Sequence, residues 1–259
     1  MDVGKKRIVV KVGTSTLTHE NGKLNFKRID KLVQVLSDLR NMGNDVILVS
    51  SGAIAVGFSK MKIQSQDKTT REKQAVAAIG QCELMFLYEK LFTQYGNNTA
   101  QILLTKKITD DTIGKENVIN TINTLLEWGV IPVINENDSV AFEEIEFGDN
   151  DTLSALISIL ADADLLILMT DIDGLYDKNP REDSNAKLIP KVTEITEKLK
   201  SNAGGAGTRR GTGGMITKLM AAEMAMENGI DMYIVNGKNP TNIYDAIKGK
   251  EVGTLFSSK

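Results

Sequence analysis

The sequence predicts an α/β protein whose largely parallel sheet has helices on both faces. Short apolar runs rich in β-branched residues recur along the chain, and amphipathic segments with helical spacing separate them. This alternation is typical of parallel strands joined by crossover helices. Polar residues follow several of the runs, and in open α/β sheets ligands bind beyond the carboxyl ends of the strands.

The first elements have clear boundaries. Residues 7–13 are a β-branched run that ends in glycine, and Lys11 lies near its end. Asn25 is a suitable N-cap for the next helix and Gly43 a suitable stop, with apolar residues between them at spacings of three and four. Residues 45–50 are predicted to form the second strand.

A turn of small residues, 51–57, follows the second strand and could begin a helix. Backbone N–H groups in such a turn bind anions readily, although a plain strand-to-helix turn explains the same residues. Residues 69–95 have helical spacing, as one helix or as two that meet near Gly80. Their apolar side chains exceed the needs of one core face, so the surplus belongs to the core or to a subunit interface. Strand 101–105 and helix 117–128 come next.

The rest of the chain continues the alternation. Further apolar strands are predicted at 129–134, 164–170 and 231–235. Further helices are predicted at 152–160, 215–228 and 241–247. Neither a repeat nor an interdomain linker is seen, so we expect residues 1–259 to form a single domain.

The composition excludes several classes of protein. Hydrophobic residues make up 41% of the chain, charged residues 25%, and the formal net charge is −3. A slightly acidic chain argues against a nucleic-acid partner, which normally needs a basic surface. A single cysteine, Cys82, excludes an intrachain disulfide and suits a reducing compartment. Neither a signal peptide nor a membrane span is recognised, so we expect a cytoplasmic protein without a membrane partner.

The segment 135–151 holds two clusters of carboxylates and amides between a predicted strand and a predicted helix. The clusters are 135–138 and 148–151, and their place at the end of a strand suits ligand binding. A solvated acidic loop that ends in an aspartate N-cap explains the same residues. The other motifs must decide between these interpretations.

Glycines lead directly into the predicted helix 215–228, which favours phosphate binding. The backbone can approach a ligand closely there, and the helix N-terminus supplies free N–H groups and positive potential. Lys218 lies one turn inside, where its ammonium could reach the same phosphate. The segment 211–218 matches neither the Walker A pattern nor G-x-G-x-x-G, and a flexible surface loop is the alternative.

Taken together, these residues indicate phosphoryl transfer. Lys11, Lys218 and the acidic and amide clusters would all gather at one edge of a parallel sheet. That reaction depends on positioning and on neutralising charge with lysine and magnesium. The only histidine, His19, lies in a polar turn and is not placed as a nucleophile. An acceptor that is itself a carboxylate needs no general base, because it is already ionised at neutral pH.

A series of motifs, in this order, resembles the glutamate 5-kinases of the amino acid kinase family. They cover essentially the whole chain and are VKVGTS (10–15), SSGAIA (50–55), PVINEND (132–138), GDNDTLSA (148–155), LMTD (168–171), Gly174-Leu175-Tyr176, GTGGMITK (211–218) and VGTLF (252–256). Related kinases of N-acetylglutamate, aspartate or carbamate typically have a Gly-Gly pair where this chain has Gly13-Thr14.

The resemblance implies a three-layer α/β/α sandwich with an open, mainly parallel central sheet. It implies ATP-dependent phosphorylation of the L-glutamate side-chain carboxylate to L-glutamyl 5-phosphate, with Mg²⁺, as the first step of proline biosynthesis. Feedback inhibition by proline and a homodimer or homotetramer are further expectations from the family. Many bacterial members carry a C-terminal PUA module, and we expect it to be absent because the chain stops at Lys259.

Site residues are implied position by position. Lys11 and Lys218 match the lysines that contact the phosphates and stabilise the transferring group, and Asp151 matches the aspartate that orients them. The glutamate-binding positions are Ser51, Gly52, Asn135, Asp138 and Asn150. The ATP-binding positions are Lys11, Thr170, Asp171, Thr212, Gly213, Gly214, Met215, Ile216, Thr217 and Lys218. No direct protein ligand for the metal is expected.

The chemistry of an amino-acid substrate suggests how these positions divide. Its α-ammonium needs a carboxylate, for which Asp138 is the candidate, and its α-carboxylate needs N–H donors, which the turn 51–53 can offer. Asp151 could also cap the helix that follows it. We expect residues 139–147 to form a flap or hairpin over glutamate.

Two rival functions stay open at this point. The first is another kinase of the same fold, acting on N-acetylglutamate or a nucleoside monophosphate. The second is a binding protein without catalytic activity on this fold. The presence of Lys11, Lys218 and Asp151 argues against the second, because a protein that only binds its ligand does not need cations for a transition state.

Overall fold

The sheet is built from the apolar runs of the sequence, most of which are buried along their length. The computed structural model describes residues 4–63, 69–105, 111–140, 150–180, 182–203 and 214–258. Its strands are β1 (Arg7–Val12), β2 (Asp45–Ser50), β3 (Thr99–Leu104), β4 (Ile131–Glu136), β5 (Leu165–Thr170), β6 (Lys191–Val192), β7 (Asp231–Asn236) and β8 (Thr254–Phe256). Their order in the described sheet is β3-β4-β2-β1-β5-β7-β8-β6.

Strand pairing is parallel apart from one pair. Neighbouring strands run parallel from β3 to β7 and again between β8 and β6, whereas β7 and β8 are antiparallel. The predicted open, mainly parallel sheet is therefore confirmed. The strand β8 and the short strand β6 were not predicted, because neither carries a long apolar run.

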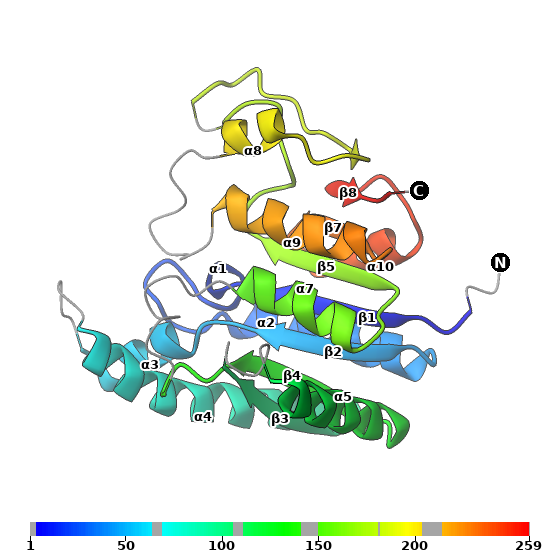
Figure 1. Ribbon diagram of the computed structural model, residues 1–259. Helices are drawn as coiled ribbons and strands as arrows, with labels where there is room; N and C mark the ends of the chain where they lie inside the picture. The colour runs from blue at the N-terminus through cyan, green and yellow to red at the C-terminus, as the bar shows by residue number, and fades with distance from the viewer. Residues whose placement is uncertain are drawn as a thin grey trace.

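Helices cover both faces of this sheet, as predicted, and make a three-layer sandwich (Figure 1). They are α1 (Thr14–Leu17), α2 (Phe26–Asn41), α3 (Ala53–Met61), α4 (Thr70–Gln94), α5 (Thr112–Glu127), α7 (Asn150–Leu160), α8 (Glu197–Ala203), α9 (Met215–Glu227) and α10 (Asn242–Ile247). One core layer contains buried residues of α2, α4 and α10, and the other contains buried residues of α5, α7 and α9. None of the described helices is long and apolar enough to cross a membrane.

Alternation along β1 shows how a single strand serves both layers. Ile8, Val10 and Val12 pack in the layer with α2, whereas Val9 packs in the layer with α7 and α9. Successive side chains of a strand point to opposite faces, so a continuous apolar run is needed where both faces are covered. Lys11 also lies on this strand and is 6% exposed, which sets it apart from its apolar neighbours.

Helix α4 is one continuous helix, so the possible break at Gly80 is wrong. It begins with a capping box in which Thr69 and Glu72 bond reciprocally. A Cβ built on Gly80 would lie 1.8 Å from the carbonyl oxygen of Ala53 at the start of α3, and one on Gly57 would lie 1.9 Å from the carbonyl oxygen of Val76. The glycine at position 80 therefore allows two helix backbones to touch.

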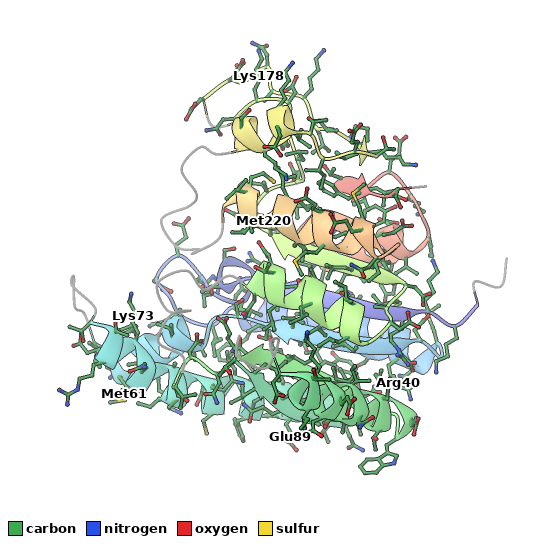
Figure 2. The ribbon with its side chains drawn as sticks, in the orientation of Figure 1. Arg40, Met61, Lys73, Glu89, Lys178 and Met220 are labelled. Carbon is green, nitrogen blue, oxygen red and sulfur yellow. The ribbon has the colours of Figure 1, made fainter. Side chains whose placement is uncertain are left out.

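The apolar surplus of α4 is divided between core and surface. Phe92 is fully buried, and Met85, Leu87 and Leu91 pack partly against the core. Phe86, however, is 63% exposed. Met61, at the end of the neighbouring helix α3, is exposed as well (Figure 2).

Side-chain caps explain where two of the predicted helices begin. Asn25 caps α2 by accepting a hydrogen bond from the backbone N–H of Arg28, as predicted. Helix α5 begins at Thr112 rather than at residue 117, because the Asp111 side chain accepts from the N–H groups of Ile113 and Gly114. An aspartate cap can start a helix before its apolar pattern becomes visible.

Candidate active site

Two adjacent residues at the start of α7, Asn150 and Asp151, contact two different groups of side chains. Both are buried, with exposures of 7% and 0%. Helix α7 begins at Asn150, so the prediction that Asp151 caps a helix starting at residue 152 is wrong. Asp151 lies inside the first turn, and its carboxylate is taken up by side chains of other elements.

The first group, which we call the ionic cluster, consists of Asp151, Lys11, Lys218 and Thr217. The Lys11 Nζ lies 2.5 Å from Asp151 Oδ1, and the Lys218 Nζ lies 2.9 Å from Asp151 Oδ2. The Thr217 Oγ1 lies 3.2 Å from the same Oδ2. The end of β1 thus meets the first turns of α7 and α9 at one buried carboxylate.

The electrostatics of the ionic cluster favour an anion. Lys11 and Lys218 are 6% and 8% exposed, so both ammonium groups have lost most of their water. The formal charges of Lys11, Lys218 and Asp151 sum to +1. Charge held in a dry site interacts strongly with an opposite charge, and lysine is a frequent ligand of phosphate. The cluster is suited to hold a phosphoryl group.

The second group, which we call the amide cluster, is neutral and consists of Asn150, Asn135, Ser51 and Gln81. The Asn150 Nδ2 donates to the Asn135 Oδ1 at 2.8 Å and to the Ser51 Oγ at 3.0 Å. It also donates to the carbonyl oxygen of Ser50 at 2.7 Å. The Asn135 Nδ2 in turn donates to the Gln81 Oε1 at 2.8 Å. Residues of β4, α4, α7 and the end of β2 therefore meet here.

The turn after β2 has the geometry that anion binding requires. Gly52 is the N-cap residue of α3 and has a φ of 99°, a left-handed conformation that favours glycine. No side chain caps this helix, whose first N–H groups follow Ser51 directly. This geometry suits the binding of a carboxylate. That role of the turn stays a prediction.

The predicted nucleotide positions lie at the end of β5 and the start of α9. Thr170 is buried and its hydroxyl donates to the Asp171 Oδ1 at 3.2 Å. Gly214 precedes α9, which has no side-chain cap, and its carbonyl oxygen accepts from the Thr217 hydroxyl at 2.9 Å. Met215 is partly buried and packs against the core, and Ile216 is 38% exposed. Thr212 and Gly213 lie outside the described residues.

The predicted ammonium ligand Asp138 lies in the turn after β4, at the same edge of the sheet. It is half-buried, between the buried Asn135 and the exposed Ser139. The expected flap over residues 139–147 lies outside the described residues from 141 onward.

Sequence reasoning did not find Gln81 or Tyr88, two residues of α4 that reach this edge. The Tyr88 hydroxyl lies 2.9 Å from the Ser50 Oγ, and both side chains are buried. Burial raises the pKa of Tyr88 above its ordinary value, so the hydroxyl stays protonated at neutral pH. Both residues lie in a strongly apolar helical segment. Such a pattern predicts that the helix packs against a core, but it does not predict which strand the helix contacts.

Among the described residues, no group of three or more His, Cys, Asp or Glu side chains could hold a metal ion. In the ionic cluster the Asp151 carboxylate already accepts from two lysines and lies within hydrogen-bond distance of the Thr217 hydroxyl. The donors present there suit the oxygens of a phosphate better than a metal ion.

Curated sequences place the chain among known proteins. Residues 6–236 match the model of the amino acid kinase family. A glutamate 5-kinase of Clostridium perfringens is 54% identical over 258 residues, which cover 98% of this chain and 96% of that protein. A glutamate 5-kinase of Listeria innocua is 52% identical, over 98% of this chain and 94% of that protein.

Solved structures agree on the fold. A UMP kinase from Ureaplasma parvum superposes with a TM-score of 0.67 at 16% identity, covering 98% of this chain and 99% of that one. An isopentenyl phosphate kinase gives a TM-score of 0.66 at 18% identity, covering 96% and 99%. At such low identity these structures bear on the fold alone. The family model matches most of the chain, and relatives share more than half of its residues. The chain therefore belongs to the amino acid kinase family.

Proposed function

We propose that this protein is a glutamate 5-kinase, which transfers the γ-phosphoryl group of ATP to the side-chain carboxylate of L-glutamate in proline biosynthesis. The observation that carries the proposal is that its two clusters adjoin: Asn150 belongs to the amide cluster and the next residue, Asp151, to the ionic cluster. Relatives named glutamate 5-kinase at more than half identity support the same assignment.

In the proposed reaction, the amide cluster binds the amino-acid end of glutamate and the ionic cluster acts on the transferring group. An oxygen of the ionised side-chain carboxylate forms a bond to the γ-phosphorus of ATP. The bond from that phosphorus to the bridging oxygen breaks, and its electron pair leaves with ADP. No proton has to be removed from the acceptor, so no general base is required.

Lys11 and Lys218 neutralise the charge that spreads over the phosphoryl oxygens, which is the main contribution a protein makes to this reaction. Asp151 holds both ammonium groups in place, through contacts of 2.5 and 2.9 Å. Thr170, Asp171 and residues 212–218 bind the nucleotide. Mg²⁺ enters with ATP as part of the substrate and is held largely by phosphate and water oxygens, as is usual for this ion.

The amino-acid end is bound by groups of both charges. The α-ammonium pairs with Asp138 and the α-carboxylate with the N–H groups after Ser51 and Gly52. The Asn150 Nδ2 has two hydrogens but three acceptors, and the contact to the Ser51 Oγ is the longest of the three at 3.0 Å. The Ser51 hydroxyl can therefore donate its own hydrogen to the substrate carboxylate.

A substrate panel tests this function. The purified protein is given ATP and Mg²⁺ with L-glutamate, N-acetyl-L-glutamate, UMP or isopentenyl phosphate, and ADP release is followed in a coupled assay. We expect release only with L-glutamate, and hydroxylamine should trap the acyl phosphate as a hydroxamate. Equal turnover of N-acetyl-L-glutamate or UMP would favour the rival kinases, and binding without ADP release would favour a non-catalytic protein.

Inhibition by proline and assembly into a dimer or tetramer belong to the same proposal. Adding L-proline to the assay at sub-saturating glutamate should lower the rate. Light scattering on the purified protein gives the number of copies per particle.

A further inference from the structure

Gln81 connects helix α4 to the amide cluster. It is half-buried, and its Oε1 accepts a hydrogen bond of 2.8 Å from the Nδ2 of Asn135. Asn135 is only 1% exposed, so water cannot readily replace this bond. A buried amide N–H group without an acceptor destabilises the folded protein, because it has lost its hydrogen bonds to water without replacing them.

The hydrogen bonds determine which way each amide faces. The backbone N–H of Glu136 donates to Asn135 at 2.9 Å, so the Asn135 atom at that position must be the oxygen. The Asn135 Nδ2 then faces Gln81, where an acceptor is required. In the same way, Asn150 must present its Nδ2 to the Asn135 Oδ1 and the Ser50 carbonyl oxygen. The Asn150 Oδ1 is thereby turned away from these acceptors.

Helix α4 is held tightly against the turn that starts α3. Gly80, the residue before Gln81, lies so close to Ala53 that a Cβ would be 1.8 Å from its carbonyl oxygen. Two turns further on, the Tyr88 hydroxyl bonds to the Ser50 Oγ at 2.9 Å. The position of Gln81 relative to Ser50 and Asn135 is therefore set by contacts on both sides of it.

We propose that Gln81 is a positioning residue for the amino-acid substrate, acting through Asn135 on the orientation of Asn150. The inference rests on the proposed function, because it concerns the site for the α-ammonium of glutamate. The essential feature is an acceptor at the end of the Gln81 side chain. Without it the Asn135 amide turns or withdraws, and Asn150 loses the partner that orients it.

Variants that differ in this acceptor test the proposal. Gln81→Met keeps a side chain of similar length but removes the acceptor oxygen. Gln81→Lys replaces that oxygen with an ammonium group, which can only donate. Gln81→Glu retains an acceptor oxygen. Gln94→Met, at the exposed end of the same helix, is the matched control. For each variant the KM values for L-glutamate and for ATP are measured along with kcat and the thermal midpoint.

We expect Gln81→Met and Gln81→Lys to raise the KM for L-glutamate by about tenfold or more, since about 1.4 kcal/mol corresponds to a factor of ten. The KM for ATP should change by less than about twofold, because Gln81 bonds to Asn135 within the amide cluster. Gln81→Glu should recover most of the loss, and Gln94→Met should behave as wild type. If Gln81→Met does not fold, Gln81→Lys carries the same comparison.

Contrary results for the positioning role can be told apart from failure of the proposed function. An unchanged KM for L-glutamate in Gln81→Met, an equal rise in both KM values, or equal damage by Gln81→Glu would overturn the positioning role. Wild-type protein that releases no ADP with L-glutamate would instead overturn the proposed function, and this inference with it.

Discussion

The ionic cluster and the amide cluster differ in chemistry although they share the first turn of α7. The ionic cluster joins Asp151 to two lysines in a buried site, whereas the amide cluster joins neutral groups by directional hydrogen bonds. Charges act in most directions and suit the stabilisation of a transferring phosphoryl group. Amides hydrogen-bond in fixed directions and suit the recognition of one shape of substrate.

This difference predicts that mutations in the two clusters affect different kinetic constants. Changes in the ionic cluster should lower kcat, because its charges act most strongly in the transition state. Changes in the amide cluster and its surroundings should raise the KM for the amino acid. The following predictions run from the largest expected effect to the smallest.

Asp151→Asn should have the largest effect. It leaves two ammonium groups in a buried site without their shared carboxylate. We expect kcat to fall by at least about 10³-fold and the free energy of unfolding to fall by about 3–5 kcal/mol. Steady-state kinetics and urea unfolding measure the two effects. A variant with normal stability and normal kcat would contradict the central place of this carboxylate.

Lys218→Met should lower kcat by about 10²–10³-fold with little change in the KM for L-glutamate. Asp151 keeps its pair with Lys11, so the fold should survive. Lys31→Met, which removes an exposed lysine on α2, is the control and should leave both constants unchanged. A large rise in the KM for L-glutamate with normal kcat would mean that the clusters do not divide the work as proposed.

Asp138→Asn should raise the KM for L-glutamate by about 10–100-fold, because a charge-assisted bond to the α-ammonium is weakened. The KM for ATP should stay nearly constant. Kinetics with one substrate varied at a time give both values. Equal changes in the two KM values would remove Asp138 from the amino-acid half of the site.

Gly80→Ala should lower the free energy of unfolding by about 1–3 kcal/mol, because the added Cβ meets a backbone oxygen. If the variant folds, its KM for L-glutamate should be higher than that of the wild-type protein, because α4 must move away from the turn that starts α3. Gly114→Ala in α5 is the matched control: its Cβ would meet a side-chain oxygen of Asp111 at 3.1 Å. That variant should be close to neutral in urea unfolding, because alanine is the better helix former.

Much of the fold was predictable from local pattern. Strands such as 45–50 contain a continuous apolar run, and α2 has a cap at Asn25 and a stop at Gly43 that agree with its apolar face. The antiparallel strand β8 was not predictable, because three residues carry no periodic signal and their pairing depends on β7. Helix α4 was only partly predictable, since a glycine in a helix indicates a break and a close contact equally well.

The candidate site divides in the same way. Polar residues after the strands indicated one edge of the sheet, and the structure brings Lys11, Lys218 and Asp151 together there. Their roles in catalysis remain predictions. Gln81 and Tyr88 had no sequence signal, because their contacts depend on how α4 crosses α3.

The sequence by itself determined the α/β class, the order of most elements, and the edge where charged and amide groups collect. Those features follow from periodicity and from residues that end strands, which act over a few neighbours. The resemblance implied different roles for Asn150 and Asp151, but only the tertiary structure decided which side chains each of these adjacent residues contacts. Adjacent residues of a helix point about 100° apart, so which partner each one meets depends on the packing of distant elements.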